Sequence, residues 1–285
     1  MIPTIPQPKL FKVSYSAYVA IFFIYLALPL LVVAVFAFNN SQFPSLPWVG
    51  FTVDWFFNDT DPMRGIFHDR RLLSSIGTSF YIAVWVSILS VSVGTTNAFL
   101  FERENFPLKN LFYMLMLMPL VIPGVILGIS ILAFSSTIAN WAEVALNLDI
   151  EILRPGKFLV IMGQFSFITT ITTLVISARL RKFDISLEEA ALNLGASKLT
   201  AIRTITLPYL KPAIIGSMIV AFLMSFENFN TTLMLTGSDQ PLTVAMYGRL
   251  REGSTPVLNA LSLLLIAISG SLALISVFVQ SEKQK

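Results

Sequence analysis

The chain has 285 residues, of which 55% are hydrophobic and only 12% are charged, with a formal net charge of +3. Soluble domains carry about 25% charged residues, so this composition indicates a protein of the lipid bilayer. The absence of cysteine and the single histidine, His68, exclude disulfide frameworks and multi-ligand thiolate or histidine metal sites, and the spread of the positive charges along the chain argues against a nucleic-acid partner.

Six apolar segments each have about the 20 residues that a helix needs to cross the hydrocarbon core. We predict membrane-spanning helices over residues 15–38, 72–100, 111–134, 157–179, 213–235 and 257–279. The first segment is too long for the apolar region of a secretory signal and lacks a small-x-small cleavage site, so we interpret it as a retained helix. The sequence therefore predicts an all-α integral membrane protein in which residues 1–285 form one transmembrane domain.

The third predicted span contains Met118-Pro119 and Ile122-Pro123-Gly124. Proline removes a backbone hydrogen bond, and membrane helices tolerate it where neighbouring elements satisfy the freed groups. We expect a kink or a local unwinding at these residues.

Positive charge is concentrated between the fourth and fifth predicted spans. Residues 179–212 contain Arg179, Arg181, Lys182, Lys198, Arg203 and Lys211. Because cytoplasmic loops of membrane proteins are enriched in lysine and arginine, we predict that this segment and both chain termini lie in the cytoplasm.

The first half of the loop 184–212 has the pattern of a short amphipathic helix. Ser186 and Glu189 have the spacing of a capping box, in which each side chain satisfies a free N–H of the first turn. Apolar residues then recur at the spacing of one helical face, at Leu187, Ala190, Ala191 and Leu194.

A turn and a second helix are predicted to follow. Gly195 stands where helices commonly end in a left-handed residue, and Ser197 is a candidate N-cap for the next helix. We expect Pro208 and Pro212 to end that helix. The apolar stripe of such a hairpin needs cover, which the membrane surface, its own bundle or a partner protein would each provide.

The same loop resembles a known motif. Glu189-Ala190-Ala191, three residues, Gly195, nine residues and then Ile205-x-Leu207-Pro208 match the EAA loop of binding-protein-dependent ABC importer permeases at every defining position. Over most of its length the chain also resembles the second permease subunit of spermidine/putrescine uptake systems, at Phe38-Asn39-Asn40-Ser41, Ala178-Arg179-Leu180 and Pro256-Val257-Leu258-Asn259-Ala260-Leu261.

This resemblance implies the type I ABC importer permease fold, with a cytoplasmic coupling helix between helices four and five seated on an ATPase subunit. The residues at that interface would be Leu187, Glu189, Ala190, Ala191, Leu194 and Gly195. The implied partners are a dimer of ATPase subunits, a second permease that is a different chain, an extracytoplasmic substrate-binding protein and the lipid of the bacterial inner membrane.

The chain contains no G-x-x-x-x-G-K-[ST] phosphate-binding loop, the motif that cradles nucleotide phosphates in P-loop ATPases. We therefore expect no catalytic residue, no metal ligand and no cofactor in this chain, with ATP and Mg²⁺ bound by the partner ATPase.

Glu227 is the only ionisable residue well inside a predicted span. Charges at such depth are costly and usually face a cavity or a partner. Asn230 and Thr231 would share its helical face, and Asn228 adjoins it, so these four residues are the candidate substrate pathway. A structural role for Glu227, near the membrane surface or bonded to another helix, stays open.

The polyamine permeases carry an Asp-Asp pair where this chain has Glu227-Asn228, which leaves the exact substrate open. Other polar residues of the spans form interhelical hydrogen bonds in many membrane proteins. We interpret Asn97, Gln164, Thr169 and Thr170 as structural.

Three other functions compete with an ABC permease. A secondary transporter without an ATPase partner often has internal repeats, and none relates the first three spans to the last three. An integral membrane enzyme would gather His, Asp, Glu or Cys near one membrane face, and the sequence shows no such cluster. A purely structural subunit fits the composition but leaves the cytoplasmic loop unexplained.

Overall fold

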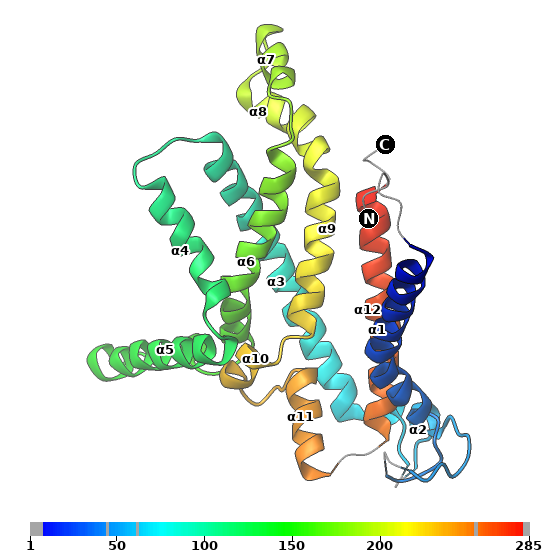
Figure 1. The fold of residues 1–285 in the computed structure, drawn as a ribbon. Coiled ribbons are helices and arrows are strands. Elements are labelled where there is room, and N and C mark those ends of the chain that lie inside the picture. Colours follow the sequence, from blue (N-terminus) through cyan, green and yellow to red (C-terminus); the bar gives the residue numbers. More distant parts are fainter. Residues whose placement is uncertain (1–7, 44–45, 61–62, 254–255, 282–285) are drawn as a thin grey trace. The chain divides into compact units, whose positions relative to one another are not determined.

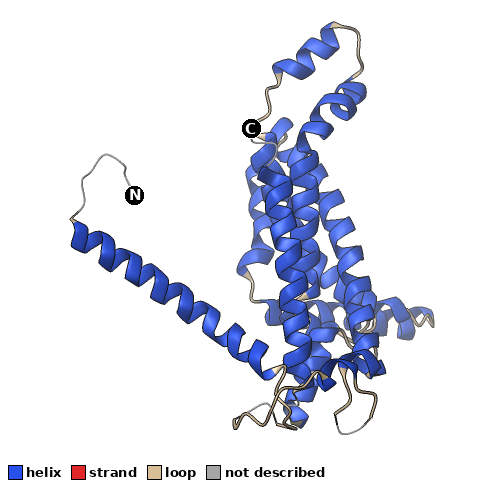
Figure 2. Cartoon of the chain, turned by 90° about the vertical axis from the view of Figure 1, so that its right-hand side faces the viewer, coloured by secondary structure: helices blue, strands red, loops and turns tan. Residues whose placement is uncertain are grey.

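A computed structural model of the chain describes residues 8–43, 46–60, 63–253 and 256–281. Within these ranges the protein is helical, and its only β-type pairing is an isolated bridge between Asn39 and Phe51 (Figure 2). Six of the described helices are long and apolar enough to cross a membrane. The predicted all-α membrane fold is confirmed.

The helices are labelled in Figure 1. They are α1 (Lys9–Phe36), α2 (Asp54–Phe57), α3 (Arg70–Arg103), α4 (Lys109–Val121), α5 (Gly124–Leu146), α6 (Lys157–Leu180), α7 (Ser186–Asn193), α8 (Lys198–Ala201), α9 (Leu207–Phe226), α10 (Asn230–Leu235), α11 (Leu242–Glu252) and α12 (Val257–Ser281). A π-helix, Ile202–Thr206, joins α8 to α9, and single 3₁₀ turns lie at Ile66–His68 and Glu151–Leu153.

The chain forms two compact units. The first comprises residues 1–70 and 249–267, and the second comprises residues 71–248 and 268–285. The predicted coupling loop and the predicted pathway residues all belong to the second unit.

In the first unit, the segment that follows α1 is folded around a buried asparagine. The Asn39 side chain accepts a hydrogen bond from the Val49 N–H at 2.9 Å, and the Trp55 indole N–H donates to the Asn39 carbonyl at 2.8 Å. Buried polar groups need such partners. Asn39 therefore fixes the loop between α1 and α2.

Helices α3, α6 and α9 form the core of the second unit (Figure 1). Near α10, Val86 of α3, Ile168 of α6 and Ala221 of α9 belong to one buried cluster. A second cluster, with Ile176 of α6 and Leu210 of α9, lies nearer the α7–α8 end of the helices. Because lipid tails are as apolar as these side chains, close packing rather than exclusion of water holds such helices together.

The local unwinding expected in the span 111–134 is confirmed, and it divides the span into two helices. The helix breaks at Ile122 and Pro123, which both have extended dihedral angles, because the residue before a proline is disfavoured in the helical region. The result is two helices, α4 and α5, and α5 runs across the end of the unit where α10 lies (Figure 1). In α4, the Met116 carbonyl accepts a hydrogen bond from Thr170 of α6 at 2.6 Å.

A glycine allows α3 and α6 to approach closely. The Thr172 hydroxyl of α6 donates to the Ser90 carbonyl of α3 at 2.7 Å. A Cβ added at Gly94 would overlap the Thr172 hydroxyl and lie 3.0 Å from the backbone nitrogen of Thr173. Small residues at such crossings are typical of membrane bundles.

We predict that Gly94→Ala lowers the free energy of unfolding by about 1–3 kcal/mol, the usual cost of overpacking. Gly77→Ala on the same helix is the matched control, because a Cβ there meets nothing within 4 Å and alanine is the better helix former. The apparent melting temperatures of the purified variants test this. Equal stability of the two variants would contradict the close α3–α6 contact.

Candidate coupling hairpin and substrate pathway

Helices α7 and α8 form a hairpin at one end of the second unit, where α6 ends and α9 begins (Figure 1). A cavity lies at the other end of α6 and α9, beside α10. The two predicted functional regions are therefore separated by the length of α9.

Asp184 caps the first helix of the hairpin. The Ser186 backbone N–H donates to the Asp184 carboxylate at 3.0 Å, and the hydrogen bonds from the hydroxyl and backbone of Ser186 lower the pKa of Asp184 below its ordinary value. The predicted Ser186–Glu189 capping box is wrong, because Ile185 already has helical dihedral angles and the free N–H groups of the first turn lie earlier in the chain.

The turn of the hairpin has the predicted geometry. Gly195 is left-handed, with a φ of 91°. The Ala196 N–H donates to the Ala191 carbonyl at 3.0 Å and the Gly195 N–H to the Leu192 carbonyl at 2.9 Å, which is the hydrogen-bond pattern of a Schellman motif. The Ser197 hydroxyl then accepts from the Thr200 N–H at 3.2 Å, so Ser197 is the N-cap of α8, as predicted.

Pro208 and Pro212 do not end the second helix, and that prediction is wrong. Residues 198–226 form one helical run, in which α8 passes through the π-helix Ile202–Thr206 directly into α9. Pro208 follows the π-helix closely, and both prolines lie within a membrane-length helix of the kind that accepts proline.

The outward face of the hairpin is apolar and uncovered in this chain. Leu187, Leu194 and Leu199 are 50%, 90% and 58% exposed, and the neighbouring Glu189 and Ala190 are also exposed. The inward positions of α7, Glu188 and Ala191, are half-buried. The predicted interface residues are therefore exposed, apart from Ala191, which is half-buried.

At the opposite end of α9 the helix stops at Phe226 and resumes as α10 at Asn230. The Asn228 side chain accepts from the Thr232 N–H at 3.3 Å and from its hydroxyl at 2.9 Å. Such local bonds compete with the helical pattern. Glu227 is therefore at the end of a helix rather than inside one, and the prediction that it shares a helical face with Asn230 and Thr231 is wrong.

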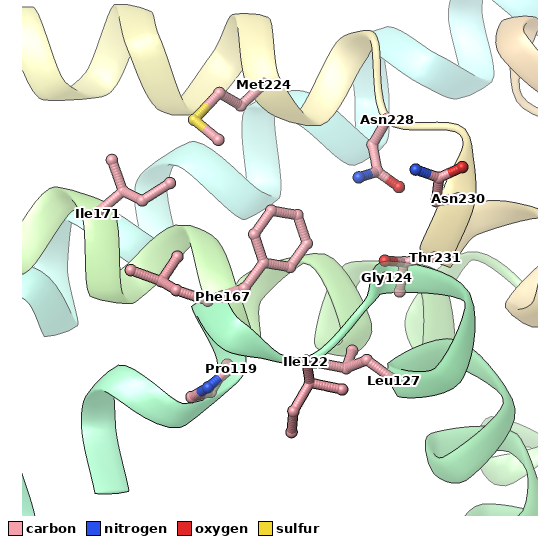
Figure 3. A pocket seen from close by; sticks show the side chains of 11 residues that line it. Pro119, Ile122, Gly124, Leu127, Phe167, Ile171, Met224, Asn228, Asn230 and Thr231 are labelled. Atoms are coloured by element: carbon pink, nitrogen blue, oxygen red, sulfur yellow. The ribbon is translucent and has the colours of Figure 1, made fainter. Parts of the chain in front are cut away.

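A cavity of about 260 Å³ lies beside this break. Asn228, Asn230 and Thr231 line it at one end, and Phe167 and Met224 are among the apolar residues that complete it (Figure 3). The Thr231 hydroxyl is buried without a hydrogen-bond partner in the chain. The cavity thus places amide and hydroxyl groups beside an aromatic ring.

Three of the four predicted pathway residues meet at this cavity, and Glu227 does not line it. Glu227 is exposed, and its carboxylate accepts a hydrogen bond from the Ser269 hydroxyl at 3.0 Å. The sequence analysis missed Phe167, Met224 and Pro119 of the lining. The prolines of the α4–α5 break were the signal for this place, because unwound segments line cavities in membrane transporters.

Gln164 of α6 holds the break in place. It is 1% exposed, its amide donates to the Thr232 hydroxyl at 2.8 Å, and its carbonyl accepts from the Ser225 hydroxyl. One buried side chain therefore bridges the end of α9 and the start of α10. In the described ranges, no three His, Cys, Asp or Glu side chains come together as metal ligands would.

The fold is that of an ABC importer permease. It resembles a chain of a bacterial ABC transporter involved in the import of the acidic polysaccharide alginate, with a TM-score of 0.76, 16% identity and coverage of 97% of this chain and 96% of the other. A second structure of an alginate ABC transporter, in complex with an alginate pentasaccharide-bound periplasmic protein, gives a TM-score of 0.73. At this identity the likeness concerns the fold alone.

Residues 87–281 match the family described as binding-protein-dependent transport system inner membrane component. The match covers most of the chain, which therefore belongs to this family of multi-pass inner-membrane permeases.

Among its relatives is the putrescine transport system permease protein PotI of Escherichia coli K12, 29% identical over 265 residues that cover 92% of this chain and 89% of PotI. The spermidine/putrescine transport system permease protein PotC of Haemophilus influenzae is 25% identical, with coverage of 92% and 94%.

We predict that Gln164→Leu destabilises the α9–α10 break, because it leaves the Ser225 and Thr232 hydroxyls without their buried partner. The expected result is faster hydrogen exchange of the amides of residues 227–235. Ser166→Ala is the control, since the Ser166 hydroxyl bonds only within its own helix, to Gly163. Unchanged exchange in Gln164→Leu would show that the bridge does not hold the break.

Proposed function

We propose that this permease imports polyamines, with putrescine or spermidine as the substrate class. The chain is a translocation subunit of an ABC uptake system, and its relatives PotI and PotC are named for these substrates. A flexible cation with several N–H donors suits the cavity, because amide and hydroxyl oxygens accept hydrogen bonds and an aromatic face attracts a cation. Glu227, one residue from Asn228, would supply negative charge at the entrance.

The proposal extends to the assembly. The hairpin would lie in the cytoplasm against an ATPase subunit, one of two that bind ATP and Mg²⁺. A second, different permease chain would complete the pathway, and an extracytoplasmic binding protein would deliver the substrate. Both chain termini would be cytoplasmic, although the terminal residues themselves lie outside the described ranges.

One observation supports this function above the others: the helical run of residues 198–226 connects the uncovered hairpin to the cavity. A movement of α8 along or across the membrane normal would be passed to Met224 and Asn228, which line the cavity. ATP binding would favour one arrangement of the cavity over the other only to the extent that the ATPases bind nucleotide better in that arrangement.

A secondary transporter would contain a cavity of this kind but would have no use for an apolar hairpin outside the bundle. Purification of the chain from its native membrane separates the two functions. Recovery together with a P-loop ATPase supports the ABC importer, and recovery without any ATPase under mild detergent conditions would contradict it.

We predict that Leu194→Glu leaves the chain folded and inserted, because Leu194 is 90% exposed, but abolishes association with the ATPase and with it substrate-stimulated ATP hydrolysis. Leu148→Glu, at an exposed leucine of the α5–α6 connection, is the matched control and should behave as the unaltered chain does. Normal co-purification of the Leu194→Glu variant would refute docking through the apolar face.

A second pair of variants separates a pathway role of Glu227 from a structural one. Glu227→Gln removes the charge, whereas Ser269→Ala removes only the hydrogen bond between the two side chains. We expect Glu227→Gln to reduce putrescine uptake by the reconstituted transporter about tenfold or more, in line with a lost charge-assisted contact, and Ser269→Ala to have little effect. Equal losses in both would assign Glu227 a structural role.

A further inference from the structure

The two adjacent glutamates of the hairpin differ in exposure. Glu189 is exposed, as are Leu187 and Leu194. Glu188 is turned toward the chain's own helices, and only 15% of its side chain is exposed. Glu189 is therefore free for a partner, whereas Glu188 is committed to contacts within the chain.

One oxygen of Glu188 joins three elements. Its Oε1 lies 3.4 Å from Nη2 of Arg103, at the end of α3, and accepts a hydrogen bond from the Thr206 hydroxyl, in the π-helix. Thr206 is fully buried. The Arg103 guanidinium also lies over the Phe183 ring, 5.3 Å from its centre, which holds the cation at the base of the hairpin.

The other ion pairs at this end of the unit differ in exposure. Lys198 and Glu104 are paired at 3.4 Å with 76% and 57% of their side chains exposed, and Arg181 of the pair with Glu102 is 60% exposed. Exposed pairs contribute little and are screened by salt, whereas buried pairs are screened much less. The Arg103–Glu188 pair, with 18% and 15% of its side chains exposed, is therefore the only one of these three pairs in which both partners are sheltered.

The contact between Glu188 and Thr206 lies at the π-helix, within the helical run of residues 198–226. The segments on either side of α7, residues 181–185 and 194–197, are not helical, so no continuous helix joins α7 to α6 or to α8. π-helical turns are often found at functional sites, and Thr206 is the last residue of this one. The contact between Glu188 of α7 and Thr206, called the pin, would make the hairpin and α9 move together.

We propose that Glu188 is the positioning residue that transmits movement of the hairpin to α9, through Thr206, with Arg103 keeping its carboxylate in place. The proposal rests on the proposed docking of the hairpin on an ATPase. Without the pin, the ATPase would rotate α7 while the cavity at the other end of α9 stayed as it was.

The test uses the complete transporter, with its own ATPase, second permease and binding protein, in proteoliposomes. Glu188→Gln and Thr206→Val each weaken the pin with little change of shape. We expect both variants to assemble and to hydrolyse ATP at the basal rate, while putrescine transported per ATP hydrolysed falls at least tenfold. Glu104→Gln, which breaks the exposed pair with Lys198, is the matched control and should keep the normal ratio.

Hydrogen exchange provides a readout that does not depend on the substrate. In the unaltered transporter, ATP should change the exchange of residues 186–197 and of residues 227–231. In Glu188→Gln, ATP should change only the first segment. A normal transport ratio and normal exchange in Glu188→Gln would overturn the proposal, as would loss of assembly in both variants, which would make Glu188 a docking residue.

Failure of the proposed function gives a different result. If ATP leaves residues 186–197 of the unaltered transporter unchanged, the hairpin does not dock on the ATPase, and the pin has nothing to transmit. If both segments respond to ATP but putrescine is not taken up, the substrate class is wrong and the pin is still tested by the exchange of residues 227–231 in Glu188→Gln.

Discussion

The helical run of residues 198–226 is the constraint on which the rest of the second unit depends. Inside a bilayer no water is present to satisfy free N–H and C=O groups, so a helix resists breaking there far more than it does in solution. Helix α8 is continuous with this run and cannot move independently of it, whereas α7 is attached through the turn at Gly195 and the contacts of Glu188. The chain therefore has the exposed apolar hairpin at one end of this helical run and the break, at Glu227-Asn228-Phe229, at the other.

The polar groups at the two ends of this helical run differ in whether their hydrogen bonds are satisfied. At the cavity end, Gln164 satisfies the hydroxyls of Ser225 and Thr232, while the Thr231 hydroxyl keeps its hydrogen-bonding capacity free. At the hairpin end, the Glu188 carboxylate is satisfied by neighbours in the same chain. These two conditions suit the proposed roles, because a substrate site must retain unsatisfied groups for its substrate, whereas a residue that transmits movement must have its hydrogen bonds satisfied.

Some local signals in the sequence predicted local features correctly. Gly195 and Ser197 define their turn through backbone geometry and one side-chain bond, and both have the predicted roles. Other local predictions failed, among them the Ser186–Glu189 capping box, because the residue pattern does not specify which backbone and side-chain bonds form. Pro208 was predicted to end a helix, but the helix continues through the π-helix and past it. Glu227 was predicted to lie within a helix, but the helix ends there and the Asn228 side chain bonds to Thr232 instead. The contact between Glu188 and Arg103 joins residues that are 85 positions apart in the chain, so no spacing pattern within the loop predicts it.

The most direct test of a stiff connection between hairpin and cavity is a distance within the run itself. Because the chain has no cysteine, spin labels are introduced cleanly at the exposed residues Leu199 and Met218. A straight helix separates these positions by about 28 Å. Double electron–electron resonance spectroscopy measures that distance in the complete transporter. The account predicts one narrow distribution that is the same without nucleotide and with ATP trapped. A broad distribution, or one that shifts with ATP, would show that the run bends at the π-helix and would contradict it.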